Sequence, residues 1–153
     1  MPKRLKILVF VDNFAPPTET FVYDHARRIS AAHDLLLVCI NRWNTELFPF
    51  TAVKQLSYPQ SKIRKIIRAR MYKHHLLLDY HNPKFQDQIS ELLRSFQPDL
   101  IHCHFGNKAL MLLDNLDAQL FQGPVFITFY GYDASELLKR RPAYRRRIRQ
   151  VLQ

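Results

Sequence analysis

Short apolar runs alternate along this chain with segments in which apolar residues recur every three or four positions. The runs at 5–11, 35–40, 100–104 and 125–129 are rich in Val, Ile and Leu, as is typical of strands buried on both faces. A weaker run at 51–58 predicts one more strand. Helical spacing predicts helices marked by residues 22–29, 63–78, 85–96 and 109–120, a short helix at 135–138 and a basic helix from 142.

The ends of these segments carry residues that start and stop helices. Thr18 is expected as an N-cap, with Glu19 in the first turn, where the helix dipole favours an anion. Gly123 and Pro124 are expected to end the helix marked by 109–120. The alternation predicts an α/β fold, a Rossmann-like, doubly wound, mostly parallel sheet, with residues 1–153 as a single domain. The last helix reaches Gln153 with no stop signal, so we expect a truncated chain or one domain cut from a longer protein.

Composition narrows the class of protein. The 153 residues are 47% apolar and carry a net charge of +10, which is typical of a globular protein that attracts nucleic acid, phosphorylated ligands or an acidic membrane face. Cys39 and Cys103 lie inside apolar runs, which favours reduced core thiols over a disulfide. The N-terminal residues do not form a signal-peptide pattern, and no run approaches the ~20 apolar residues of a membrane-spanning helix. We therefore expect a cytoplasmic protein.

Positive charge is concentrated in two segments. Six Lys and Arg residues lie within 62–73, and seven more lie within 139–149. A basic amphipathic helix suits an anionic membrane surface, although a helix face exposed to solvent explains the same pattern equally well. The residues expected at a membrane surface are Lys62, Lys65, Arg68 and Lys73.

Polar residues and glycines gather where the predicted strands end, which is the edge at which ligands bind in open parallel α/β sheets. Gly106 and Gly131 each follow a strand, and glycine there permits a positive φ and the close approach of a ligand. The candidate catalytic carboxylates are those of Glu19 and Asp133. The candidate substrate-binding residues are Thr18, Thr20, His104, Phe105, Gly106, Tyr130 and Gly131.

Simpler explanations exist for several of these positions. A cap for the helix near Ser135 explains Asp133 about as well, and the helix dipole explains Glu19. His102 and His104 share one face of their strand, and such a pair can ligate zinc. No third or fourth ligand lies at metal-like spacing, so we expect neither a metal nor a cofactor. The absence of a Walker loop and of G-x-G-x-x-G argues against an NTPase or a standard NAD site.

Three segments in order, "PPTETFVYDHARRI", "PDLIHCHFG" and "ITFYGYDAS", resemble the N-terminal half of bacterial family 4 glycosyltransferases, which have the GT-B fold. The resemblance spans residues 6 to about 138 and is closest to the enzymes that build exopolysaccharide, capsule or colanic-acid-type chains. It implies two Rossmann-like domains around a cleft, with the acceptor held by the N-terminal domain and the nucleotide-sugar by the C-terminal domain. It also implies retention of anomeric configuration without a bound metal.

The resemblance assigns Glu19 to the acidic residue of the family's Ser/Thr-Glu-Thr-Phe segment, and Gly131 and Asp133 to its His-Gly-x-Asp segment. Tyr130 stands where many members carry histidine. A tyrosine can still donate one hydrogen bond but carries no positive charge near neutral pH. The donor-binding C-terminal domain with its Glu-x7-Glu segment is absent from these 153 residues, so we expect this fragment alone to be inactive.

The resemblance therefore implies part of a retaining hexosyltransferase of surface polysaccharide biosynthesis. Its expected partners are a nucleotide-sugar donor, a glycan or lipid-linked acceptor and an anionic membrane surface, with the protein peripheral on the inner face of the plasma membrane. One alternative is a basic nucleic-acid-binding module, which the lack of an RRM, KH or helix-turn-helix signature disfavours. Another is a non-catalytic subunit of a split transferase.

Overall fold

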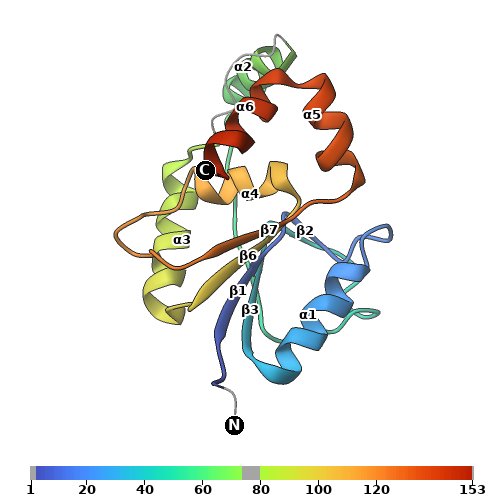
Figure 1. The fold of residues 1–153 in the computed structure, drawn as a ribbon, viewed down its shortest axis with the longest axis vertical. Helices are drawn as coiled ribbons and strands as arrows, with labels where there is room; N and C mark the ends of the chain where they lie inside the picture. Colours follow the sequence, from blue (N-terminus) through green and yellow to red (C-terminus); the bar gives the residue numbers. More distant parts are fainter. Residues whose placement is uncertain (1–2, 74–79, 153) are drawn as a thin grey trace.

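The structure is a computed structural model that describes residues 3–73 and 80–152 (Figure 1); for residues 64, 65, 68, 72 and 73 it describes the backbone only. The strands are β1 (Lys6–Phe10), β2 (Asn13–Phe14), β3 (Asp34–Cys39), β4 (Asn41–Arg42), β5 (Val53–Gln55), β6 (Leu100–His104) and β7 (Val125–Thr128). The helices are α1 (Phe21–Ala32), α2 (Lys62–Lys73), α3 (Pro83–Phe96), α4 (Gly106–Leu113), a π-helix (Tyr132–Glu136), α5 (Leu137–Arg140) and α6 (Pro142–Val151).

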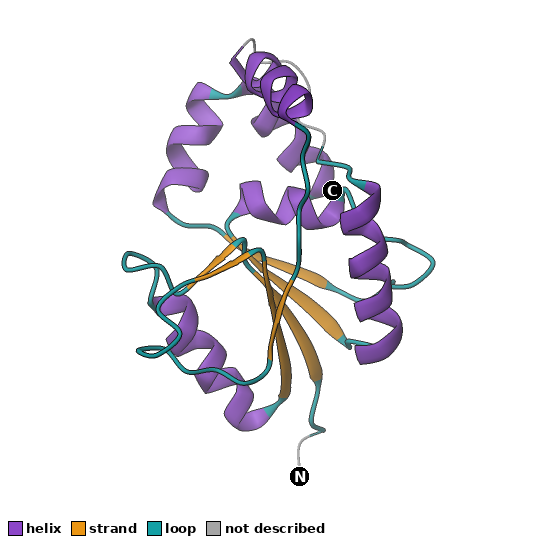
Figure 2. Cartoon of the chain, turned by 180° about the vertical axis from the view of Figure 1, so that it is seen from behind, coloured by secondary structure: helices purple, strands orange, loops and turns teal. Residues whose placement is uncertain are grey.

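Five strands form one parallel sheet in the order β5-β3-β1-β6-β7, and helices flank both faces of this sheet (Figures 1 and 2). The predicted α/β class with a Rossmann-like, doubly wound sheet is confirmed. The chain moves outward from β1 through β3 to β5, and it returns to the other side of β1 to add β6 and β7. The strand order therefore switches between β1 and β6, which is where such sheets bind ligands.

Alternate residues of β1 enter two separate cores, which is why its whole run is apolar. Val9 packs on the α1 side of the sheet together with Val22 of α1, whereas Leu8 packs on the other side with Phe85 of α3. The three central strands β1, β3 and β6 are all buried in this way. Burial on both faces therefore holds in place the strands whose carboxyl ends form one edge of the sheet, called the carboxyl edge below.

A third, smaller core joins α4 to the C-terminal helices. Leu110 of α4 packs against Leu137 of α5 and against Tyr144 and Ile148 of α6. Figure 1 shows these helices beyond the end of the sheet to which the strand arrows point. The C-terminal helices are thus fixed next to the carboxyl edge of the sheet.

Helix α1 begins at Phe21, so the prediction of Thr18 as the N-cap is wrong. Thr20 holds the N-cap position with a helical backbone and no side-chain cap bond, and Thr18 is exposed. The amide of Glu19 instead donates to the carbonyl of Pro16, which makes a separate turn ahead of the helix. Glu19 therefore precedes the helix and does not lie in its first turn.

Helix α4 ends at Leu113, and the prediction of a helix through residue 120 is wrong. The fully buried Asn115 donates from its side-chain amide to the carbonyls of Met111 and Tyr80 and accepts from the amide of Asn82. These bonds to another segment hold the chain away from the helix axis. Gly123 consequently lies in the connection to β7 and does not end a helix.

Helix α2 forms as predicted up to Lys73, and the remainder of the predicted helix, residues 74–79, lies outside the described residues. Its apolar face does not enter a core, because Ile63, Ile66 and Ile67 are 70%, 66% and 51% exposed. Within the described part of the chain, every helix is too short or too polar to cross a bilayer. Cys39 and Cys103 are buried free thiols, as predicted.

Candidate functional site

The switch point between β1 and β6 is bridged by an ion pair. Asp12 follows β1 and is only 8% exposed, and its Oδ2 pairs with Nζ of Lys108 on α4. The backbone carbonyl of Asp12 accepts hydrogen bonds from the amides of Ile40 and Asn41, which fixes this residue at the strand end. Charges of both signs are therefore held where ligands of open α/β sheets bind.

Glu19 lies beside this pair with an unsatisfied oxygen. Its side chain is half-buried, and its Oε2 atom is buried without a hydrogen-bond partner among the described residues. Burial and the nearby Asp12 carboxylate raise the pKa of Glu19, while Lys108 partly opposes this. A buried carboxylate oxygen without a donor is costly, so this position favours the binding of a hydroxyl or amide group.

Three aromatic rings form a continuous surface next to Glu19. The ring of Tyr130 lies 4.7 Å from that of Phe21 and 4.6 Å from that of Phe105, measured between centroids. Burial, together with Asp133 and Glu19, raises the pKa of the Tyr130 phenol, so the hydroxyl keeps its proton at neutral pH. The surface can therefore offer both flat apolar area and a hydroxyl group.

The carboxylate of Asp133 accepts hydrogen bonds from backbone amides at this edge of the sheet. Its side chain is 1% exposed, its Oδ2 accepts from the Gly106 amide at 2.5 Å, and its Oδ1 accepts from the Tyr130 amide at 2.6 Å. Because Gly106 is the first residue of α4, the carboxylate caps that helix and not the helix near Ser135. Asp133 thus joins the loops after β6 and β7, and both of its oxygens are occupied.

The positive φ predicted for the glycines at this edge is wrong, because none of the three glycines has a positive φ. The left-handed backbone falls on Phe105, with φ of 66°. A Cβ on Gly106 would strike the Phe129 ring and the Tyr144 hydroxyl, so this glycine admits neighbouring side chains and not a ligand. Gly131 is helical and exposed, with open space around it.

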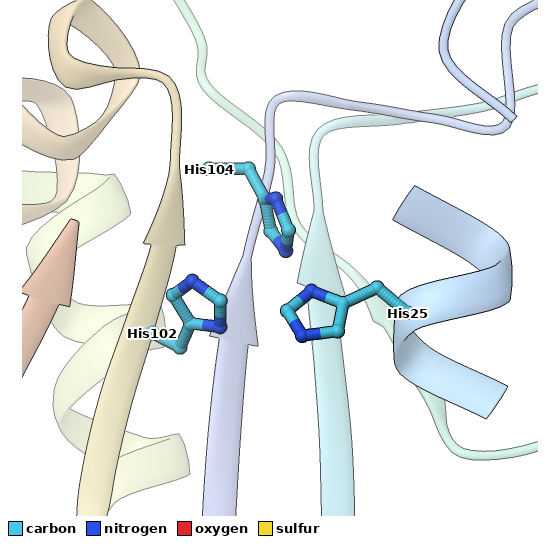
Figure 3. Close-up of side chains that lie close together, drawn as sticks. All are labelled: His25, His102 and His104. Carbon is cyan, nitrogen blue, oxygen red and sulfur yellow. The ribbon is translucent and has the colours of Figure 1, made fainter. Parts of the chain in front are cut away.

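Three imidazoles meet on the α1 side of β6 (Figure 3). His102 and His104 come from the strand, and His25 faces them from α1, with ring centroids 5.2 and 5.4 Å away. Burial lowers the pKa of His102 to about 4 and that of His104 to about 3, with the neighbouring histidines adding to the shift. Both rings are therefore neutral at pH 7. The sequence around β6 offers no third histidine, and the fold brings one from a distant helix.

Most of the predicted site residues lie together at one edge. Tyr130 is the connecting residue, because its hydroxyl lies 2.7 Å from His104 Nδ1, its amide bonds Asp133, and Glu19 acts on its pKa. Thr18 and Gly131 are exposed, and the carbonyl of Gly131 accepts a hydrogen bond from the Ser135 hydroxyl. The predicted membrane residues lie on α2, where Lys62 is exposed and the side chains of Lys65, Arg68 and Lys73 are outside the described residues.

Sequence reasoning missed four residues of this edge: Asp12, Phe21, His25 and Lys108. Asp12 was detectable, because it directly follows the first strand of a predicted doubly wound sheet. Two cavities lined by described residues lie elsewhere on the protein. One, of about 490 Å³, is near Pro59, and the other, of about 480 Å³, is near Phe121. The site at the carboxyl edge is therefore defined by its chemistry and not by those cavities.

Comparison with known proteins assigns no family to this chain. No protein-family model matches it, and no curated protein shows significant similarity to it. The likeness to family 4 glycosyltransferases thus rests on the three sequence segments given above, and a functional interpretation must be supported by the geometry of the carboxyl edge.

Proposed function

We propose that this chain is the acceptor-side domain of a retaining glycosyltransferase and that the edge around Glu19 and Tyr130 binds a saccharide. The observation that carries this proposal is the buried, unpartnered Oε2 of Glu19 beside the aromatic surface of Phe21, Phe105 and Tyr130. A sugar ring presents an apolar C–H face and a rim of hydroxyl donors. The aromatic rings complement the first, and the carboxylate oxygen complements the second.

The three sequence segments that resemble the glycosyltransferase family all contribute to this edge. Glu19 and Phe21 belong to the first segment, Phe105 to the second and Tyr130 to the third. Because these segments are far apart in the sequence, their contacts at the carboxyl edge support a shared role. In the proposed enzyme, a second domain would bring the nucleotide-sugar to this open surface.

Within this proposal the two carboxylates have different roles. The Oε2 atom of Glu19 is buried without a hydrogen-bond partner among the described residues, so Glu19 would contact the saccharide directly once its half-buried side chain turns toward the ligand. Asp133 has both oxygens on backbone amides, so it acts as a positioning residue that holds the loops after β6 and β7. Tyr130 replaces the family's histidine as a neutral hydrogen-bonding group, because its phenol stays protonated.

Saccharide binding can be tested with the 153-residue protein on a panel of bacterial oligosaccharides, followed by NMR titration of any that bind. We expect Glu19→Gln to weaken binding about tenfold or more, because a hydrogen bond to a charged group is worth about 1.5–3 kcal/mol. Phe21→Ala should weaken binding as well, because it removes one ring of the aromatic surface. Asp87→Asn is the matched control, since Asp87 is exposed on α3. The proposal fails if no oligosaccharide binds or if Glu19→Gln binds as tightly as the wild type.

We also propose that α2 contacts an anionic membrane surface. Ile63, Ile66 and Ile67 are mostly exposed, and Lys62 and Arg70 are exposed on the same helix. Nucleic acid would attract the charges but offers no apolar phase for isoleucine side chains, so lipid is the favoured partner. The basic helix α6 lies at the same end of the molecule as α2 (Figures 1 and 2).

Vesicle sedimentation tests this membrane contact. We expect binding to vesicles of phosphatidylserine and phosphatidylcholine, loss of binding at high salt, and weaker binding by Ile66→Ser. Leu47→Ser is the control, because it removes an exposed apolar side chain that does not belong to α2. Equal binding to neutral vesicles, or tighter binding to DNA than to anionic vesicles, would contradict the proposal.

A further inference from the structure

We propose that His25, His102 and His104 form a zinc-binding site on the α1 side of the sheet. One ligand atom from each imidazole can be chosen so that all three lie within 4.8 Å of one another. Two of the residues are held by a central strand and the third by the helix packed over it, so the cluster is anchored by the core of the fold. This inference does not depend on saccharide binding.

The first line of support is an unsatisfied nitrogen. His104 is fully buried, and its Nε2 atom has no hydrogen-bond partner in the described part of the chain. The neighbouring strand β1 offers it no polar side chain on this face of the sheet, because Val9, the residue of β1 in register with His102, is apolar. An imidazole kept there without a partner for its nitrogen is costly, and a metal ion would supply that partner.

The second line of support is that both strand histidines have a hydroxyl group within hydrogen-bond distance of one ring nitrogen. Nδ1 of His104 lies 2.7 Å from the Tyr130 hydroxyl, and Nε2 of His102 lies 2.8 Å from the Thr128 hydroxyl. Metal-binding histidines almost always direct their second ring nitrogen to such an oxygen, which fixes the tautomer and aims the other nitrogen at the ion. Nε2 of His104 and Nδ1 of His102 are thereby left for the metal.

The arrangement of the rings requires only a small adjustment. Figure 3 shows the three imidazoles facing a common space, with His25 opposite the two rings of the strand. Tetrahedral zinc with bonds of about 2.0–2.1 Å needs its ligands roughly 3.3 Å apart, so the most distant pair must approach by roughly 1.5 Å. His25 is half-buried on a helix, and rotation of its side chain can provide most of this movement.

The chemistry of the cluster selects the class of metal. All three ligands are imidazole nitrogens, which suit zinc and its transition-metal neighbours, whereas magnesium and calcium require oxygen ligands. Three protein ligands leave one position of a tetrahedral ion for water or for an oxygen of a bound molecule. Because His25 and His102 are only half-buried, that position can be reached from solvent.

Zinc binding can be measured on the 153-residue protein after treatment with a chelator, by competition with a chromophoric zinc indicator. We expect one zinc per chain with submicromolar affinity, and a visible spectrum of tetrahedral type when cobalt(II) replaces zinc. His25→Gln should weaken binding at least tenfold, and Thr128→Val should weaken it about tenfold because it leaves all three ligands but frees His102 Nε2.

His33→Gln is the matched control, because it removes a histidine at the end of α1 and leaves the three ligands intact. Circular dichroism of each variant shows that it folds, and His25 is preferred over the buried His104 for that reason. The proposal stands if zinc binding is lost in His25→Gln and kept in His33→Gln. It is overturned if the wild-type chain binds no zinc, or if a folded His25→Gln variant binds zinc as tightly as the wild type.

Discussion

Replacing Asp133 with alanine is predicted to destabilise the protein by several kcal/mol. The change leaves the buried amide of Gly106 and the part-buried amide of Tyr130 without their acceptor, and each such loss costs about 1–3 kcal/mol. Removal of the anion from the start of α4 adds up to about 1 kcal/mol, and relief from burying a carboxylate offsets part of the total. A net loss of about 2–5 kcal/mol is a large share of the roughly 5–15 kcal/mol that stabilises a domain.

Urea unfolding at pH 7, followed by circular dichroism, measures this loss. Asp133→Asn keeps one acceptor oxygen but places an NH2 group against the other donor, so its stability should lie between those of the wild type and Asp133→Ala. Asp87→Ala removes an equal charge from an exposed position on α3 and should change stability by less than about 0.5 kcal/mol. If Asp133→Ala also stays within about 0.5 kcal/mol of the wild type, its carboxylate does not hold the edge together. A direct part in catalysis would then regain support.

Three further predictions concern the same fold. Gly106→Ala should destabilise the protein by about 1–3 kcal/mol in urea unfolding, because the added methyl group meets the partly buried Phe129 ring and the Tyr144 hydroxyl. Gln97→Gly should stabilise the protein by about 0.5–1 kcal/mol and so raise its thermal unfolding midpoint. Gln97 caps the end of α3 with a left-handed backbone, φ of 50°, which glycine adopts without strain. In the folded protein the pKa values of His102 and His104 are about 4 and 3, well below the ordinary value of 6.5. Below pH 6.5 these two histidines therefore bind more protons in the unfolded state than in the folded state. With a chelator present to remove metal, the free energy of unfolding should fall as the pH drops from about 6.5 to about 4. A His102→Gln variant should lose less free energy of unfolding over this pH range.

The sheet was predictable from the sequence because its central strands are buried on both faces. A strand with two cores needs an uninterrupted apolar run. The runs at 5–11, 35–40 and 100–104 differ from the observed strands by at most one residue at each end. The two-residue strands β2 and β4 give no such pattern, because they are too short to show a period. Burial on both faces thus explains why the central strands were predictable and why the two-residue strands were not.

The errors have tertiary causes. Leu116 and Leu120 continue the helical spacing of α4, but bonds from Asn115 to a distant segment end the helix first. Gly106 indicated a close ligand approach, whereas it is needed because the Phe129 ring and the Tyr144 hydroxyl of α6 pack closely against it. Likewise, His25 lies far from His102 in the sequence, and only the packing of α1 over the sheet joins them.

Tyr130 connects the proposed saccharide surface to the proposed zinc site, which has consequences for both. Its ring belongs to the aromatic surface with Phe21 and Phe105, while its hydroxyl holds Nδ1 of His104. An ion on Nε2 of that histidine would fix a proton on Nδ1, so the histidine would donate to the tyrosine oxygen and leave the phenolic proton free to donate to a ligand. Zinc and a saccharide hydroxyl would then strengthen each other's binding by the same factor, because linkage between two sites is reciprocal. The neutral tyrosine at this position is therefore the group through which the two sites would be coupled.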